Sequence, residues 1–418
     1  MKRMLMHGHG ELLQTAVLMG GRLIDFYMEQ SESSGLVGNV YKGRVVNVLP
    51  GMQAAFVDIG LGKNAFLYID DLLHPHLEKQ PEQKPSITEL VKPGQELVVQ
   101  VMKEPMGSKG ARVTTHFTLP GRWLVYMPIA GYIGVSKKIM AESERSRIRM
   151  IGERLRQGEE GIIMRTAAEG ECEESLGADV EQLRQLWTSV LQRATQAKAP
   201  AELHREAGLL RRAVRDTMTD DIDEVWLDDA SRSSEAVSLL KEMTPHLTGR
   251  LKLFDARKER TSLFDRFGVT EQIEAAFQSR IRLESGGSLI WDETEALTVI
   301  DVNTAKYTGA TGLEDTVFRT NMEAADEIAR LLRIRDVGGI IIIDFIDMEN
   351  ESNREKVMAR LSDWAKKDRT KCTVFGWTRL GLLELTRRKA RDNAARQLSE
   401  SCPACGGTGK KSSFISRL

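Results

Sequence analysis

Cysteine, net charge and long apolar runs are all scarce in this sequence. Its 418 residues include four cysteines, too few and too unevenly spaced for a disulfide framework. The formal net charge is −1, so a polyanion would have to be bound by local basic patches. No run approaches the roughly 18 apolar residues that span a membrane, and the N-terminal residues lack the apolar core of a signal peptide. We therefore expect a globular, cytoplasmic protein of several domains.

Histidine is missing from the C-terminal part of the chain. All seven histidines precede residue 279, which excludes a metal-free acid–base mechanism that takes two imidazoles from residues 279–400. Histidines from other parts of the fold remain available. Catalytic chemistry built within residues 279–400 alone must therefore use other side chains.

Two apolar segments of this region each end in a carboxylate. ALTVIDVNT reaches Asp301 and Asn303, and GGIIIIDFIDM reaches Asp344. With a helix between them, they predict an α/β layered domain whose apolar strands are buried on both faces. Ligands of such sheets gather beyond the carboxyl ends of the strands. The predicted strands are residues 286–292, 296–304, 338–348 and 372–378.

Carboxylates and an amide at strand ends are hard oxygen ligands that suit magnesium. This ion is commonly held by one or two carboxylates together with a substrate phosphate, and it assists phosphoryl transfer. For each aspartate taken singly, a turn or a helix cap is the competing interpretation. The repetition of the pattern on two strands favours a Mg²⁺ site made by Asp301 and Asp344. Asp347 is either an outer carboxylate of that site or a surface residue.

Residues 37–118 have the texture of a small barrel. Five short strands separated by turns predict an OB-type barrel. Phe56 and Phe66, interleaved with basic residues such as Lys109, predict a surface that stacks bases and binds phosphates. The alternative is that these aromatic rings belong to the barrel core.

The segment CPACGGTGK near the C-terminus contains a CxxC pair. Cys402 and Cys405 are half of a tetrahedral thiolate site for zinc. The other two ligands would come from Cys172 and Cys372, or from a second chain, in which case Zn²⁺ links a dimer. Redox chemistry and simple burial remain alternatives. No Ser or Thr directly follows Lys410, so the segment is not a Walker loop.

Several longer segments together resemble the bacterial ribonuclease E/G family, most closely its ribonuclease G branch. They are GNVYKGRVVNVLPGMQAAFVDIG, IMRTAAEG, SGGSLIWDETEALTVIDVNT, NMEAADEIARLLRIRDVGGIIIIDFIDM and CPACGGTG, in order from about residue 37 to residue 407. This wide and ordered coverage is more specific than any single motif.

The resemblance implies an endoribonuclease that cuts single-stranded, A/U-rich RNA, leaves 5′-phosphate and 3′-hydroxyl ends, and acts in rRNA processing and mRNA decay. Asp301 and Asp344 would bind the catalytic Mg²⁺, and Asn303 would orient the scissile phosphate or the attacking water. The family also implies a homodimer linked by one shared Zn²⁺ at Cys402 and Cys405. In the barrel, the matching RNA-contacting residues are Phe56, Phe66 and Lys109.

Family members prefer substrates with a 5′-monophosphate. The matching pocket consists of Gly121, Val125, Arg165 and Thr166, with a basic residue at Lys371. An arginine fork with a hydroxyl suits a terminal phosphate, which has more free oxygens than an internal phosphodiester. Where the ribonuclease E branch carries arginine, Lys371 offers a point charge without the planar fork.

The resemblance also implies a multidomain α/β and α+β architecture. It would comprise a ribonuclease H-like subdomain (1–36 and 215–278), an OB-fold RNA-binding barrel (37–118), a 5′-sensor region (119–214), a deoxyribonuclease I-like catalytic domain (279–400) and a zinc link with a tail (401–418). We expect neither the small C-terminal domain nor the degradosome scaffold of longer relatives. The alternative functions are a non-catalytic RNA-binding protein and a DNA phosphodiesterase. Both carboxylates are present, which favours the endoribonuclease over the first alternative.

Overall fold

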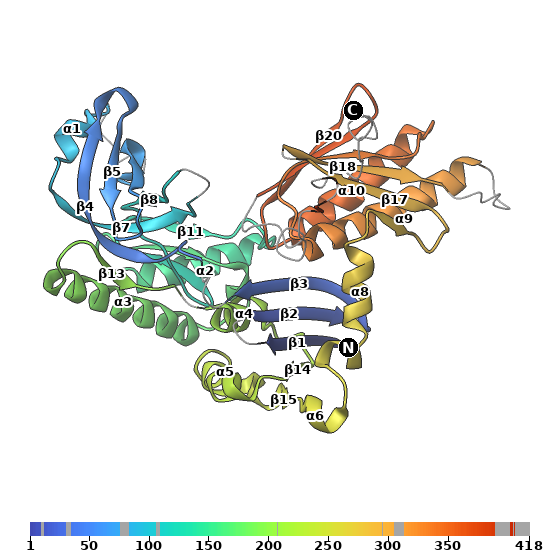
Figure 1. The fold of residues 1–418 in the computed structure, drawn as a ribbon, viewed down its shortest axis with the longest axis horizontal. Coiled ribbons are helices and arrows are strands. Elements are labelled where there is room, and N and C mark those ends of the chain that lie inside the picture. Colours follow the sequence, from blue (N-terminus) through green and yellow to red (C-terminus); the bar gives the residue numbers. More distant parts are fainter. Residues whose placement is uncertain are drawn as a thin grey trace. The chain divides into compact units, whose positions relative to one another are not determined.

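The computed structural model describes residues 1–9, 12–30, 35–75, 83–105, 109–206, 208–294, 296–304, 313–388, 402–403 and 405. The chain forms two compact units, one made of residues 1–29, 220–237 and 247–418, and the other of residues 30–219 and 238–246 (Figure 1). No helix within the described ranges is long and apolar enough to cross a membrane.

Five strands of the second unit close into a barrel, as the sequence predicts. The order is β4-β5-β6-β8-β7, with β7 pairing back onto β4, and β13 adds to β4 from outside. Alternate residues such as Val57 and Leu67 fill the interior of the barrel, and the residues between them face outward. The elements are β4 (Val40–Leu49), β5 (Ala54–Asp58), β6 (Ala65–Tyr68), α1 (Ile87–Leu90), β7 (Glu96–Lys103), β8 (Arg112–Thr114) and β13 (Ala201–His204).

A smaller sheet with three helices completes the second unit. Its order is β11-β12-β10-β9, and α2 and α3 pack on it through apolar stripes. Trp187 of α3 is buried against Phe117, with ring centroids 4.5 Å apart, so it is a core residue. The elements are β9 (Leu119–Pro120), β10 (Leu124–Met127), β11 (Ile133–Val135), α2 (Glu142–Leu155), β12 (Gly161–Met164), α3 (Glu173–Gln196) and α4 (Leu209–Thr217).

The first unit begins with a five-stranded sheet of order β15-β14-β1-β2-β3. Strand β1 pairs in parallel with β14, more than 200 residues away in sequence, for example Leu5 with Trp226. The sheet therefore joins the N-terminal segment to the middle of the chain. Its elements are β1 (Lys2–His9), β2 (Leu12–Met19), β3 (Arg22–Gln30), β14 (Glu224–Leu227), α5 (Ala230–Met243), β15 (Leu251–Leu253), α6 (Ala256–Glu259), α7 (Leu263–Arg266) and α8 (Val269–Ala276).

The second sheet of this unit has the order β16-β17-β18-β19-β21-β20. Only β18 and β19 pair in parallel, and every other neighbouring pair is antiparallel. The four predicted strands are present, but β16 and β21 were not predicted. The elements are β16 (Arg280–Arg282), β17 (Ser288–Glu293), β18 (Leu297–Asn303), α9 (Leu313–Ile334), β19 (Gly339–Asp344), α10 (Glu351–Lys367), β20 (Cys372–Trp377) and β21 (Leu383–Arg387).

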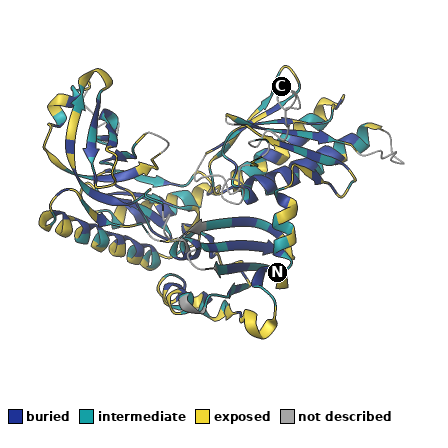
Figure 2. Ribbon diagram, in the orientation of Figure 1, coloured by how far each residue is buried: buried dark blue, intermediate teal, exposed yellow. Residues whose placement is uncertain are grey.

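The prediction that these apolar strands are buried on both faces is wrong. In β18 and β19 buried residues such as Ile300 and Ile343 alternate with more exposed ones. Figure 2 shows buried, intermediate and exposed residues mixed along the strands of the described chain. Ile340 is 50% exposed and Phe375 on β20 is 67% exposed. Among the described elements, helices α9 and α10 pack against the face that carries the buried strand residues, and we call the opposite face the open face. The length of the apolar runs led us to expect too much burial. β-Branched side chains such as isoleucine also occur in strands that are buried on one face only.

Candidate active site

Asp301 and Asp344 are neighbours on two parallel strands. Both lie at the C-terminal ends of their strands, and the pairing register matches Asp301 of β18 directly with Asp344 of β19. Paired strands lie about 4.8 Å apart. The buried residues Ile300 and Ile343 precede them on the opposite face, so both carboxylates stand on the open face. The fold thus brings together two groups separated by 43 positions of sequence (344 − 301).

Asn303 is tied to the first of these carboxylates. Its Nδ2 donates a hydrogen bond to Asp301 Oδ2 at 2.7 Å. Because Asn303 lies two residues further along β18, its side chain stands on the same face. The amide therefore fixes the orientation of the Asp301 carboxylate.

The site carries concentrated negative charge. Partial burial, and then repulsion from Asp301 and Asp347, raises the pKa of Asp344 above its ordinary value. Within the described ranges none of these three carboxylates has a basic partner. A divalent cation would relieve this repulsion, so the donor set fits magnesium.

The number of protein ligands also bears on the choice of metal. No group of three or more His, Cys, Asp or Glu side chains in the described part of the chain is arranged to hold a metal ion. A cation at Asp301 and Asp344 would take its other ligands from water and substrate phosphate. Magnesium is usually bound in this way.

The backbone beyond Asp344 is held by a residue that sequence reasoning missed. Asn321 of α9 is fully buried; its Nδ2 donates to Ile346 O at 2.8 Å and its Oδ1 accepts from Ile346 N at 3.1 Å. These bonds satisfy both polar groups of one peptide position and fix the segment that carries Asp347. The sequence feature that could have revealed Asn321 is its position on the apolar stripe of α9, between Val317 and Ala324, where an amide is unusual.

Arg165 and Gly121, predicted to sense a 5′-phosphate, are in direct contact. Arg165 Nη1 donates to Gly121 O at 2.6 Å, and Nη2 donates to Asp216 Oδ1 at 2.6 Å. Thr166 is exposed and its Oγ1 lies 2.9 Å from Ser136 Oγ. Val125 lies on β10, next to the strand that ends at Met164. These residues form one cluster at the ends of β10 and β12.

The fifth predicted sensor residue, Lys371, belongs to the other unit. It is exposed, and it directly precedes β20. Its carbonyl oxygen accepts a hydrogen bond from Arg388 N at 2.8 Å. Its backbone is therefore tied to the residue that follows β21.

Asp216 links Arg165 to a second arginine. Arg215 Nη2 lies 3.0 Å from Asp216 Oδ2, and Arg215 Nη1 lies 2.9 Å from Glu206 Oε1. Burial acts to raise the pKa of Asp216, but hydrogen bonding from Arg215 and the charge of Arg165 outweigh it and hold that pKa below the ordinary value. Asp216 therefore stays ionised and positions the Arg165 fork.

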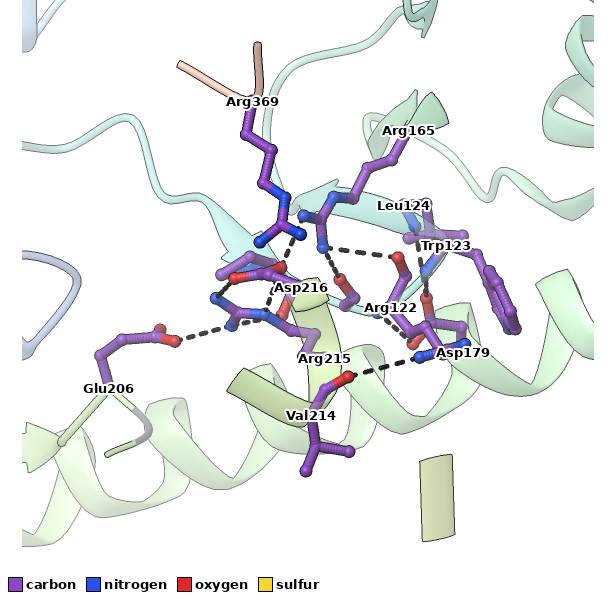
Figure 3. A network of polar contacts seen from close by, with 12 residues as sticks. Arg122, Trp123, Leu124, Arg165, Asp179, Glu206, Val214, Arg215, Asp216 and Arg369 are labelled. Atoms are coloured by element: carbon purple, nitrogen blue, oxygen red, sulfur yellow. Dashed lines mark hydrogen bonds and ion pairs between the residues drawn. The ribbon is translucent and has the colours of Figure 1, made fainter. Parts of the chain in front are cut away.

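The loop that carries Gly121 is fixed by another residue absent from the sequence prediction. Asp179 of α3 is buried and accepts hydrogen bonds from the backbone N–H groups of Arg122, Trp123 and Leu124 at 3.3, 2.8 and 3.3 Å (Figure 3). A Cβ at Gly121 would lie 2.5 Å from Asp179 Oδ1, so any larger residue would displace the carboxylate that holds this loop. The sequence feature that could have revealed Asp179 is a carboxylate on the buried stripe of α3.

Comparison with known proteins places this architecture in one family. A family model described as "Ribonuclease E/G family" matches residues 118–390. The chain belongs to the ribonuclease E/G family. It is 43% identical over 402 residues to "Ribonuclease G" of Salmonella typhimurium and 44% identical over 402 residues to "Ribonuclease G" of Escherichia coli strain K12; each match covers 95% of this chain and 81% of the relative. "Ribonuclease E" of Nostoc sp. is 38% identical over 374 residues, 89% of this chain and 54% of that protein.

In this member of the family, Phe56 and Phe66 stand outside the barrel core. They face each other across β5 and β6 with ring centroids 6.0 Å apart, in an edge-to-face arrangement, and both are half-buried. Neither belongs to the cluster that fills the barrel, so the core interpretation is wrong for both. Lys109 is exposed and has no charged partner among the described residues.

The cysteines offer only part of a zinc site. Cys402 is exposed, Cys405 is half-buried, and neither is in a disulfide. Burial raises the pKa of the Cys372 thiol to about 11, which disfavours the thiolate that zinc requires. Across the described residues, no third side chain completes a metal-binding group with the CxxC pair.

Proposed function

We propose that this protein is a magnesium-dependent endoribonuclease that hydrolyses single-stranded, A/U-rich RNA to 5′-phosphate and 3′-hydroxyl ends, in rRNA processing and mRNA decay. The observation that carries the proposal is the register pairing of Asp301 with Asp344 on the open face. Two adjacent carboxylates without basic partners among the described residues suit a cation that is shared with a phosphate. The ribonuclease names of the relatives support RNA as the substrate.

Each residue of the site has a defined task in this proposal. Asp301 and Asp344 would hold Mg²⁺, which supplies charge stabilisation at the scissile phosphate and activates water. Asn303 orients Asp301 through its Nδ2. The amide oxygen of Asn303 accepts no hydrogen bond from a described residue, so it is available to the attacking water. Asn321 keeps the backbone after Asp344 in place, so the two carboxylates retain their separation.

Selectivity for single strands follows from the barrel surface. A base can stack on Phe56 or Phe66 only when it is not paired in a duplex. Lys109 is exposed and precedes β8, the strand that pairs with β6, and it would supply a cation for the backbone phosphates. We also propose that Cys402 and Cys405 share one Zn²⁺ with the same pair of a second chain, which would make the protein a homodimer.

The function is tested with one single-stranded, A/U-rich RNA and an all-deoxy strand of the same sequence, each with magnesium or with chelator. We expect cleavage of the RNA alone, and only with magnesium, with 5′-phosphate and 3′-hydroxyl product ends. Binding of the RNA without cleavage would leave the non-catalytic RNA-binding function. Equal cleavage of both strands would point to a general phosphodiesterase.

Arg165→Lys tests the proposed 5′ sensor. A lysine cannot contact Gly121 O, Asp216 and a terminal phosphate together, because it lacks the planar fork. We expect the native protein to cleave a 5′-monophosphate RNA faster than its 5′-hydroxyl form, and the variant to lower this ratio about tenfold. The measurement is kcat/KM for both substrates.

The 5′-hydroxyl substrate serves as an internal control for this variant, because its kcat/KM should be unchanged. Arg149→Lys, at an exposed arginine of α2, provides a matched control that should retain the native ratio. An unchanged ratio in Arg165→Lys would contradict the sensor role.

A further inference from the structure

A cavity of about 340 Å³ lies next to the carboxylate pair. Its walls are the segment after Asp344, the first turn of α10 and the turn between β20 and β21. Its volume falls within the range of roughly 300–1,000 Å³ that is usual for small-molecule sites. Of the residues that line this cavity, only Asp347 was named from the sequence as a candidate site residue.

The pairing of β19 with β21 brings this cavity to the active site. Ile343 pairs with Leu383, so the turn that precedes Leu383 lies beside Asp344 at the end of β19. Asp347 lines the cavity and also interacts electrostatically with Asp344. A chain whose phosphate is held at Asp301 and Asp344 would therefore meet this cavity within one nucleotide or two.

The turn between β20 and β21 is held in one conformation. Thr378 Oγ1 accepts hydrogen bonds from Leu380 N at 3.2 Å and Leu382 N at 3.1 Å. Gly381 has a φ of +82°, which glycine adopts without strain. Arg379 and Leu380 are therefore presented at the exposed tip, where Leu380 is 85% exposed.

The two cationic groups of the cavity wall, Arg354 and Arg379, differ in whether a carboxylate neutralises them. Arg379 has no hydrogen-bond or ion-pair partner among the described residues. The guanidinium carbon of Arg354 lies 5.0 Å from the centre of the Trp377 ring, and Arg354 Nη1 lies 3.5 Å from Glu351 Oε2. Arg354 is thus already paired with Glu351, whereas Arg379 is the cation of the cavity wall that remains available to an anion.

The aromatic wall adds a second feature. Trp377 packs against Phe345 with ring centroids 5.8 Å apart, and its indole Nε1 donates to no acceptor in the described part of the chain. A buried N–H without an acceptor is destabilising, and this one belongs to a residue that lines the cavity. The Arg354 guanidinium lies over the Trp377 ring, and guanidinium and indole groups are both side chains on which bases stack.

We propose that this cavity is a nucleotide subsite, which binds the RNA nucleotide adjoining the scissile phosphate, with Arg379 on its phosphate and the Arg354–Trp377 pair against its base. The inference rests on the proposed function, since it names where the same substrate continues beyond the carboxylates. It assigns to Arg379 a substrate-positioning contact.

Arg379→Gln tests the subsite with a series of single-stranded RNAs shortened one nucleotide at a time from either end around one cleavage site. On the full-length RNA we expect kcat/KM to fall roughly 10- to 100-fold, the usual effect of losing a charged hydrogen bond. In the native protein one particular truncation should produce a similar fall. In the variant that truncation should have almost no further effect, because the contact is already lost.

Lys366→Gln is the matched control. Lys366 lies near the C-terminal end of α10, is 66% exposed and pairs with Asp363 at 2.9 Å. Its replacement removes one positive charge from the same sheet-and-helix domain and should leave kcat/KM unchanged. The subsite would be overturned if Arg379→Gln, like Lys366→Gln, left kcat/KM unchanged. It would also be overturned if every truncation lowered kcat/KM of Arg379→Gln by the same factor as in the native protein.

Binding of the full-length RNA in chelator separates the two proposals. Fluorescence anisotropy should show weaker binding by Arg379→Gln than by Lys366→Gln, with a salt dependence of log K smaller by about 0.7, as for one lost single-strand phosphate contact. If the native protein binds but does not cleave with magnesium, the endoribonuclease proposal fails, while this difference still decides the subsite. Equal binding by both variants would refute the subsite.

Discussion

Asp344→Asn is expected to lower the cleavage rate at least about 100-fold while leaving RNA affinity in chelator unchanged. Replacing groups that only support a metal ligand costs about 10- to 100-fold, so a direct ligand should cost more. Asparagine keeps the shape of the side chain but removes the charge that would be shared with Asp301. Single-turnover cleavage in magnesium, with anisotropy in chelator, measures both quantities.

The same variant should gain stability when no metal is bound. The pKa of Asp344 is raised in the folded protein by burial and by the charges of Asp301 and Asp347. The folded state therefore favours the protonated form, and stability is lost as pH rises through the unfolded and then the folded pKa. At neutral pH in chelator, Asp344→Asn should unfold at a higher temperature than the native protein, and this advantage should vanish at acidic pH.

Asp363→Asn is the control for Asp344→Asn. Asp363 is 64% exposed on α10 and pairs with Lys366, so its replacement should leave cleavage unchanged. If Asp344→Asn cleaved at the native rate, the carboxylate pair would not be the catalytic site. If it also lost RNA affinity in chelator, a general loss of structure would explain the result better.

Asp368→Ala is expected to produce the largest loss of stability among the changes considered. The Arg387 side chain is 4% exposed; its Nε lies 2.8 Å from Asp368 Oδ2 and its Nη1 lies 2.9 Å from Asp336 Oδ1. These pairs raise the pKa of Arg387 although burial opposes it. Removing one partner leaves a buried guanidinium only partly compensated, which costs about 3–5 kcal/mol. The midpoint of urea unfolding measures this loss.

Two comparisons make the Asp368 result specific. Asp363→Ala breaks the exposed pair with Lys366 and should cost no more than about 1 kcal/mol. The double variant Asp368→Ala/Arg387→Leu should lose less than the two single changes added together, because it leaves no unpaired guanidinium. A cost for Asp368→Ala equal to that for Asp363→Ala would show that the buried network contributes little.

The local sequence predicted most strands but not their partners. Strand β21 shows the alternation of a half-buried strand in Leu383 and Leu385, yet its third inward position is Arg387. A charge at an inward position argues against a strand unless its partners are known, and those partners, Asp336 and Asp368, are distant in sequence. The position of β21 between β19 and β20 followed from these long-range contacts.

The candidate site likewise contains residues that the sequence predicted and residues that only the structure revealed. Asp301, Asn303 and Asp344 could be found because each ends or follows an apolar run, a pattern carried by a few adjacent residues. Asn321, Asp179 and Asp216 act through hydrogen bonds to groups 25 to 57 positions away in sequence, so no local pattern shows what they hold.

By itself, the sequence determined the period of most strands, the barrel of residues 37–118 and the resemblance to the ribonuclease E/G family. These depend on side-chain alternation and on short ordered motifs, which are local properties of the chain. Only the tertiary structure decided the register that matches Asp301 with Asp344, the open face of the sheet and the cavity at Arg379. These depend on pairings between distant segments, whose energies come from burial and hydrogen bonds that exist only once the chain has folded.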